Sequence, residues 1–142
     1  MKVSLNRINN NYFFQAKGAS GIPVLIDNKT EEESKGASPM ELLLMGVGGC
    51  SAIDVVMILK KQRQEITSYK MEVEGQRKEV REAKPFEAIH VTLYLKGKID
   101  EAKAIRAAKL SFEKYCSVSI TLEASVKITY SIVLNGKPLG MT

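Results

Sequence analysis

The sequence predicts an α+β fold. Apolar residues alternate with period two in several short segments, as in β-strands, and only two longer segments show helical spacing. The resulting order is three strands, helix, two strands, helix and strand, which lacks the strict alternation of a doubly wound parallel sheet. No internal repeat or linker divides the 142 residues, so we predict a single domain over residues 1–142.

The first part of the chain predicts a small antiparallel meander. Residues 2–8, 11–17 and 22–27 are expected to form short strands, because Asn-rich and Gly-containing segments separate them. Residues 28–37 are polar and Glu-rich without apolar periodicity, so we expect a loop there.

A long helix should begin at Pro39. Ser38 is a suitable N-cap and Glu41 follows it by three residues, which is the capping-box pattern. Lysines near residue 61 would lie at the negative end of the helix dipole, so the helix should end at about residue 63. Residues 42–59 approach the length of a membrane span, but glycines and polar residues interrupt them. We therefore predict a helix at the centre of a globular core and no membrane association.

The second half of the chain should contain two longer strands, a helix and a final strand. The strands are expected at residues 68–80 and 86–98, the helix at 100–115 and the last strand at 124–134, followed by an Asn-Gly turn. Four apolar residues recur at helical spacing in the predicted helix: Ile105, Ala108, Phe112 and Cys116. Cys116 is therefore expected to end the apolar face of that helix.

Composition and charge narrow the class of protein. Hydrophobic residues make up 44% and charged residues 26%, as in an ordinary globular protein. The net charge is +5, but the basic residues are interleaved with Glu, for example over residues 72–82, so we predict no nucleic-acid partner. Residues 1–16 lack the apolar core of an export signal, which favours the reducing cytoplasm, where two cysteines remain thiols.

The inventory of reactive side chains excludes several chemistries. The single His and two Cys cannot form a four-ligand structural zinc site. His90 lies on the strand face opposite Ile89 and Val91, so we expect a partly exposed histidine and no Cys-His hydrolase. The glycines at 46–49 fall inside a predicted helix, which fits neither a P-loop nor a dinucleotide-binding turn.

Small residues form one face of the long helix. Gly46, Gly49, Cys50 and Ile53 fall at helical spacing. Each mid-helix glycine costs roughly 1 kcal/mol relative to alanine, so close packing must offset this cost. We predict packing against the same helix of a second subunit and hence a dimer.

Two interpretations of the cysteines remain open. Each thiol can be a small buried apolar group, or Cys50 and Cys116 can act as a pair if their two helices meet. Asp54 lies one helical turn beyond Cys50, and an uncompensated carboxylate disfavours a thiolate. A reactive Cys50 therefore requires a cation or hydrogen-bond donors nearby.

Three segments resemble one known family. Residues 38–44 (SPMELLL), 48–52 (GGCSA) and 115–119 (YCSVS) are similar to the osmotically inducible protein C and organic hydroperoxide resistance (OsmC/Ohr) family. The resemblance implies an intertwined homodimer, in which antiparallel sheets wrap long central helices, and no metal or organic cofactor. It also implies that Cys50 is the peroxidatic and Cys116 the resolving cysteine, with an organic hydroperoxide as substrate and an external dithiol as reductant.

The sequence departs from the family pattern at one position. Characterised hydroperoxide reductases of this family use an Arg from the first strands, held by a Glu ten residues before the reactive cysteine, where this chain has Met40. Glu41 is already explained as a capping residue, and Arg7 is the only Arg among the first 62 residues. The two cysteines make a thiol-dependent peroxidase the main hypothesis. The missing Glu makes a non-peroxidatic redox-sensing or apolar-ligand-binding protein the alternative.

Overall fold

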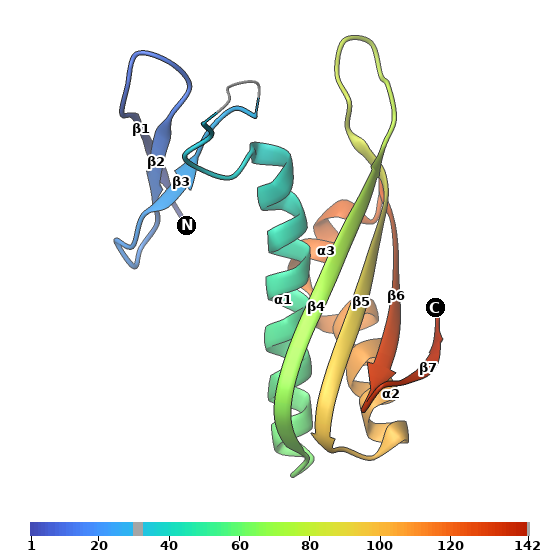
Figure 1. Ribbon diagram of the computed structural model, residues 1–142. Coiled ribbons are helices and arrows are strands. Elements are labelled where there is room, and N and C mark those ends of the chain that lie inside the picture. The colour runs from blue at the N-terminus through green and yellow to red at the C-terminus, as the bar shows by residue number, and fades with distance from the viewer. Residues whose placement is uncertain (30–32, 142) are drawn as a thin grey trace. The chain divides into compact units, whose positions relative to one another are not determined.

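The α+β prediction is confirmed, with three strands before the first long helix and a four-stranded sheet after it (Figure 1). The computed structural model describes residues 1–29 and 33–141. The chain forms two compact units, Met1–Leu43 and Leu44–Thr142, and each is described by itself. One domain over residues 1–142 stays a prediction.

The N-terminal unit contains the predicted antiparallel meander. Strands β1 (Ser4–Arg7), β2 (Phe14–Lys17) and β3 (Val24–Ile26) pair in that order. Beyond β3, the buried Asp27 carboxylate accepts hydrogen bonds from the backbone N–H groups of Asn28 (2.7 Å) and Lys35 (3.0 Å). These bonds hold both ends of the predicted loop, of which residues 30–32 lie outside the described residues.

Helix α1 (Pro39–Lys61) begins with the predicted capping box. The Ser38 N–H donates to Glu41 Oε2 (2.8 Å), and the Glu41 N–H donates to Ser38 Oγ (3.3 Å). Lys29 lies 2.5 Å from Glu41 Oε1 and, with the Ser38 hydrogen bonds, lowers the pKa of this carboxyl. By length and composition alone α1 could cross a membrane, a property that core helices of soluble proteins share.

The C-terminal unit contains a four-stranded sheet. Strands β4 (Glu65–Arg77), β5 (Phe86–Lys98), β6 (Lys127–Leu134) and β7 (Lys137–Met141) are neighbours in that order. One pair departs from the antiparallel sheets that the resemblance implies, because β5 and β6 are parallel and helices connect them. The predicted Asn-Gly turn is present, with positive φ at Asn135 and Gly136, and it leads into β7, which the sequence analysis missed.

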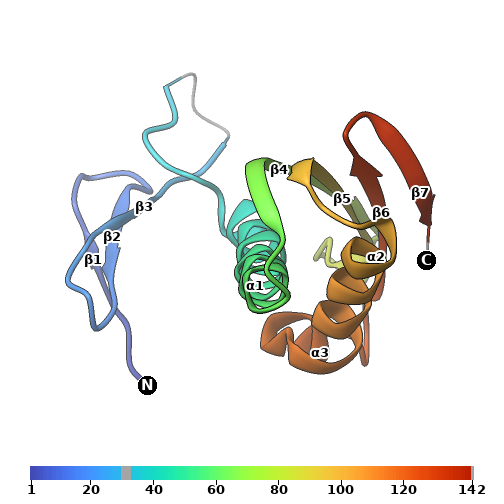
Figure 2. The same cartoon turned by 90° about the horizontal axis from the view of Figure 1, so that it is seen from below.

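Helices cover one face of this sheet. In Figures 1 and 2, α1, α2 (Glu101–Leu110) and α3 (Ser117–Leu122) lie on the same side of β4, β5 and β6. Apolar side chains from β5, α1 and α2 form the core between the layers; they include Ile89, Val91, Leu93, Leu95, Val47, Val55, Leu59, Ala104, Ala107 and Ala108.

The glycines of α1 differ in what they face. A Cβ at Gly48 would lie 2.9 Å from Val73 Cγ2, so this glycine allows α1 to approach β4 closely. Gly48 is outside the predicted small-residue face. A Cβ at Gly46 would lie 3.7 Å from Val118 of α3, whereas Gly49 has nothing within 4 Å. The glycines of the predicted face therefore have different surroundings, since Gly46 faces α3 and Gly49 faces open space. The contact of this face with a second subunit remains a prediction.

The predicted helix over residues 100–115 is interrupted. After α2, residues Ser111–Tyr115 form a π-helical turn, η1, in which the Cys116 N–H donates to the Ser111 carbonyl oxygen (2.7 Å). Helix α3, which was not predicted, follows at once. The expectation that Ile105 shares the apolar face with Cys116 is wrong, since Ile105 is 43% exposed. Ile105 lies outside the buried face of α2, which Ala104, Ala107 and Ala108 form before the π turn begins.

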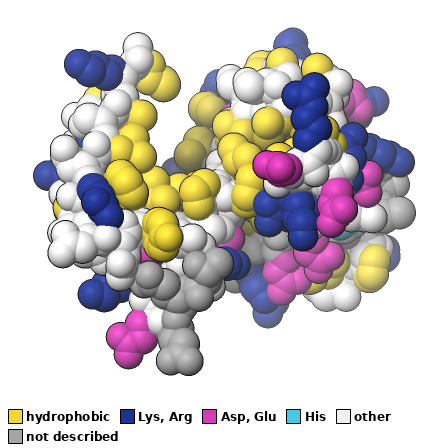
Figure 3. Space-filling view, turned by 90° about the horizontal axis from the view of Figure 1, so that it is seen from above, with side chains coloured by type: hydrophobic (Ala, Val, Ile, Leu, Met, Phe, Trp, Pro, Cys, Tyr) yellow, Lys and Arg dark blue, Asp and Glu magenta, His cyan; other side chains and the backbone are white. Residues whose placement is uncertain are grey.

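Charged side chains of both signs are mixed at the surface. On the face shown in Figure 3, Lys and Arg side chains lie among Asp and Glu side chains. Three exposed ion pairs in the C-terminal unit have the same character: Lys70–Glu72, Lys84–Glu79 and Lys137–Glu101.

Candidate functional site

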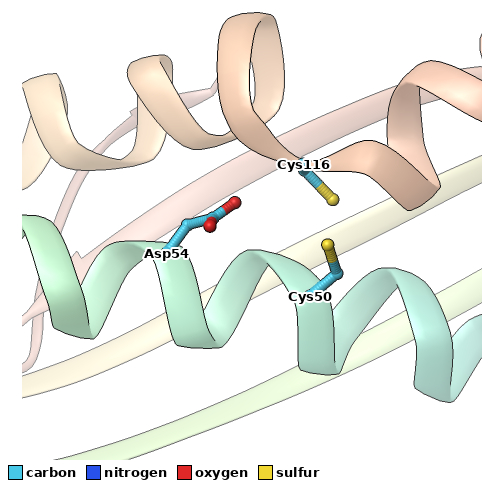
Figure 4. Close-up of side chains that lie close together, drawn as sticks. All are labelled: Cys50, Asp54 and Cys116. Atoms are coloured by element: carbon cyan, nitrogen blue, oxygen red, sulfur yellow. The ribbon is translucent and has the colours of Figure 1, made fainter.

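Cys50 and Cys116 lie next to each other in the C-terminal unit. Cys50, in the middle of α1, is half-buried, and Cys116, between η1 and α3, is fully buried. Their Sγ atoms and a carboxylate oxygen of Asp54 all lie within 4.8 Å of one another. Figure 4 shows the two sulfur atoms pointing toward each other, with the Asp54 carboxylate beside them. The two cysteine-bearing segments therefore meet, which is the condition that a functional pair requires.

Local backbone structure positions these three side chains. Cys50 and Asp54 are four residues apart on α1 and therefore lie on the same face of the helix. Cys116 has an extended backbone conformation (φ −70°, ψ 96°). It is both the C-cap of η1 and the N-cap of α3. The break between these two helices therefore turns Cys116 toward α1.

The sulfur of Cys116 is also the N-cap of α3. It accepts hydrogen bonds from the Ser119 N–H (3.4 Å) and from the Ser119 hydroxyl (3.1 Å). Burial raises the pKa of the Cys116 thiol, and the neighbouring Cys50 side chain acts in the same direction, whereas the Ser119 hydrogen bonds act in the opposite direction. Cys116 is therefore a neutral thiol near pH 7.

Ser111 is a site residue that the sequence analysis missed. Its buried hydroxyl donates to Asp54 Oδ2 (3.1 Å) and lies 3.4 Å from the Ser51 carbonyl oxygen. This hydrogen bond partly compensates the charge of the Asp54 carboxylate, whereas the sequence led us to expect a cation or hydrogen-bond donors near Cys50. Within residues 44–141, no Lys, Arg or His nitrogen lies within 4.0 Å of this carboxylate.

Sequence signals for the two serines differ. Ser119 follows Cys116 by three residues, the spacing of an N-cap and its partner, so this contact had a weak signal in the sequence. Ser111 precedes Cys116 by five residues. Two residues five positions apart in a regular α-helix point about 140° away from each other, so only the π turn brings both side chains toward α1.

A cavity of about 340 Å³ opens beside Asp54. Residues of α1, α2 and η1, together with Gln62 directly after α1, line it. Met57, Ile58, Leu110 and Tyr115 are apolar or aromatic, and Lys61, Gln62 and Arg106 are polar. The Gln62 Oε1 atom is buried without a hydrogen-bond partner among the described residues. The cavity has the size and the mainly apolar lining of a small-molecule site.

Two further candidate residues, His90 and Arg7, have hydrogen-bond partners within their own units. His90 is half-buried, as expected, and its ring nitrogens contact Thr129 Oγ1 (2.7 Å) and Ser131 Oγ (3.0 Å) on β6. The Arg7 guanidinium, in the N-terminal unit, donates to the carbonyl oxygens of Asn10 and Asn11. Because both ring nitrogens of His90 contact hydroxyl groups of β6, His90 does not pair with either cysteine.

Comparison with known proteins identifies the family. Residues 31–131 match the family model of OsmC-like proteins. The chain belongs to the OsmC-like family. Protein YhfA of Escherichia coli (strain K12) is 42% identical over 121 residues, which are 83% of this chain and 87% of YhfA.

Solved structures share the OsmC-like fold. A hypothetical protein from Aquifex aeolicus VF5 is 35% identical with a TM-score of 0.83, covering 94% of this chain and 95% of that one. An organic hydroperoxide resistance protein OsmC from Legionella pneumophila has a TM-score of 0.64 at 16% identity, over 92% and 94% of the two chains. The second likeness concerns the fold alone. The OsmC/Ohr resemblance found in the sequence is thus confirmed at the level of family and fold.

Proposed function

We propose that this OsmC-like protein is a thiol-dependent peroxidase that reduces organic hydroperoxides, with Cys50 as the peroxidatic and Cys116 as the resolving cysteine. The observation that supports this most directly is the convergence of the two Sγ atoms within 4.8 Å, from segments far apart in sequence. An oxidative-stress defence in the cytoplasm is the corresponding role.

The reaction has three steps. The Cys50 thiolate attacks the O–O bond of the hydroperoxide, takes up one oxygen as sulfenic acid and, with one proton, releases an alcohol. The Cys116 sulfur then attacks the sulfenic sulfur, so that an S–S bond forms and water leaves. An external dithiol reduces the disulfide. The S–S bond needs a separation of about 2.05 Å, so small rotations of both side chains must precede its formation.

The surroundings of the two sulfurs support this division of roles. Cys50 is half-buried and reachable from the surface, whereas Cys116 is fully buried and a neutral thiol. A resolving thiol needs access only to Cys50. The Ser119 donors stabilise the Cys116 thiolate when it forms during the second step.

The apolar cavity favours an organic peroxide. Met57, Ile58 and Leu110 offer apolar surface next to Asp54, which hydrogen peroxide would not use. The OsmC-like fold that this chain shares with the Legionella organic hydroperoxide resistance protein agrees with such a substrate.

Peroxide consumption tests the proposal. Reduced wild-type protein should consume cumene hydroperoxide with dithiothreitol as electron donor, and Cys50→Ser should abolish this activity. Cys116→Ser should accumulate a Cys50 sulfenic acid that dimedone labels, whereas the exposed Ser117→Ala serves as a matched control with wild-type turnover. Full activity of Cys50→Ser would refute the proposal.

We also propose that the protein acts as a homodimer. Met45, Ile53 and Met57 of α1 are 58%, 67% and 47% exposed, and Gly49 in the same row leaves room for a close approach. Ile53→Glu should shift the mass measured by light scattering from dimer to monomer, and the exposed substitution Glu113→Lys should not. A monomeric wild-type protein would contradict this assembly.

A non-peroxidatic, apolar-ligand-binding protein is the second candidate, and two observations favour it. Met40 stands where the family's peroxidases have a Glu, and the cavity beside Asp54 is suited to a ligand. Intact mass after treatment with cumene hydroperoxide separates the two functions. A loss of two hydrogens per chain supports the Cys50–Cys116 cycle, and an unchanged mass supports the binding protein.

A further inference from the structure

Asp54 has no task in the peroxidase mechanism, although it lies beside both sulfur atoms. A carboxylate oxygen within 4.8 Å of two thiols opposes the formation of a thiolate. Ser111 donates one hydrogen bond to Asp54, and among residues 44–141 no basic side chain makes an ion pair with it. A cation bound between the three groups would convert this unfavourable arrangement into a favourable one.

We propose that reduced Cys50 and Cys116, together with Asp54, bind Zn²⁺ or a similar borderline-soft divalent cation, and that disulfide formation abolishes the site. This differs from the metal-free site that the family resemblance implies. The proposal does not require peroxidase activity, because metal binding depends only on the reduced sulfurs and the carboxylate.

The geometry fits three protein ligands of zinc. Zn–S distances of about 2.3 Å and Zn–O distances of about 2.1 Å place tetrahedral ligand atoms about 3.5 to 3.8 Å apart. The three ligand atoms already lie within 4.8 Å of one another, so changes of about 1 Å in side-chain position suffice. Two of the ligands lie one turn apart on α1, and the third lies at the break before α3.

Ligand type selects the metal. Two thiolates favour Zn²⁺ over Mg²⁺ and Ca²⁺, which prefer oxygen ligands. The charge of the cation compensates the two thiolates and the carboxylate. With three protein ligands, a fourth position is left for water, as is usual in zinc sites that are not purely structural.

Hydrogen bonds around the site orient its ligands. The Ser111 hydroxyl donates to Asp54 Oδ2 at 3.1 Å, and the Ser119 hydroxyl and N–H donate to the Cys116 sulfur. Partners of this kind fix ligand orientation in metal sites and are typically worth ten- to a hundredfold in metal affinity. The two serines thus serve the metal-bound state as well as the thiol state.

Oxidation removes the site. Two-electron oxidation of Cys50 and Cys116 forms an S–S bond between them. The two thiols release two protons in this step, whereas the two zinc-bound thiolates release the zinc ion. The oxidant is an organic hydroperoxide, which accepts both electrons and takes up two protons, from the thiols or, when zinc is bound, from solvent, to become an alcohol and water. A disulfide sulfur has no negative charge, so only Asp54 remains as an anionic ligand.

Zinc titration of the full chain tests the proposal. We expect calorimetry of the reduced protein with ZnCl₂ to give one zinc per chain and release of about two protons, measured from buffers of different ionisation enthalpy. Co²⁺ in place of zinc should give sulfur-to-cobalt charge-transfer absorption. Protein oxidised with diamide should lose this binding and this absorption.

Variants locate the site. Cys50→Ser and Asp54→Asn should each weaken zinc binding about tenfold or more, whereas Glu113→Gln, an exposed acidic position, should leave it unchanged. The comparison of reduced and oxidised wild-type protein needs no variant and remains valid if one fails to fold. No zinc binding by the reduced protein, equal binding after oxidation, or a cobalt spectrum without sulfur ligation would each overturn the proposal.

Discussion

Ser111→Ala should lower the free energy of unfolding by about 2 kcal/mol. The serine is fully buried, and its hydroxyl donates to Asp54 Oδ2 at 3.1 Å. Hydrogen bonds to charged groups contribute about 1.5 to 3 kcal/mol, and here the carboxylate would lose its one donor from η1. With a urea m-value of about 2 kcal/mol/M, the expected loss lowers the urea midpoint by about 1 M.

A double-mutant cycle with Asp54→Ala isolates this hydrogen bond. Urea unfolding is followed by circular dichroism at one fixed protein concentration, with a reductant and a chelator present, so that neither disulfides nor metals contribute. Ser117→Ala, an exposed serine of α3, is the matched control and should change the midpoint little. A coupling energy of at least about 1 kcal/mol between Ser111 and Asp54 is expected. Additive effects within about 0.3 kcal/mol would refute the assigned hydrogen bond.

Four further variants test other parts of the structure in the same unfolding assay. Tyr69→Phe should leave stability at pH 7 unchanged or raise it, because the buried hydroxyl has no partner among the described residues, and a clear loss would contradict this. Burial raises the pKa of Tyr69, so the wild-type protein should lose stability relative to this variant as pH rises above about 10. Gly48→Ala should lower the urea midpoint, because the new Cβ would lie 2.9 Å from a methyl group of β4. Gly46→Ala would make an ordinary 3.7 Å contact and should raise the free energy of unfolding by up to about 1 kcal/mol. The reverse order of the two variants would count against the α1–β4 packing. Ser38→Ala should cost about 1 kcal/mol through the lost cap, and no loss would show that the capping box contributes little.

Local signals in the sequence predicted the elements that local interactions determine. The start of α1 follows from the reciprocal hydrogen bonds of Ser38 and Glu41, which need only neighbouring residues. The alternation of Ile89 and Val91 in β5 likewise predicted a strand with one buried face. The family motifs added the pairing of Cys50 and Cys116, which no local pattern contains.

Other features depend on contacts that a sequence pattern does not contain. β7 is short and has little apolar alternation, so the sequence predicted only the hairpin turn at Asn135-Gly136 and not the strand that follows it. The parallel pairing of β5 and β6 follows from the path of the helices between them. The π turn of η1 was not predictable from periodicity, because one extra residue in the turn changes the face of every residue after it.

That π turn links the fold to the chemistry of the site. In a regular helix the Cys116 N–H would bond to the Phe112 carbonyl, and Ser111 and Cys116 would point about 140° apart. In the structure this N–H bonds to Ser111 instead, so the Ser111 hydroxyl reaches Asp54 while the Cys116 sulfur reaches Cys50. Both proposed states of the site, the reactive thiol pair and the metal-bound pair, need this arrangement. A variant that restores a regular helix at η1 should therefore remove both peroxide reduction and zinc binding, even if the C-terminal sheet remains folded.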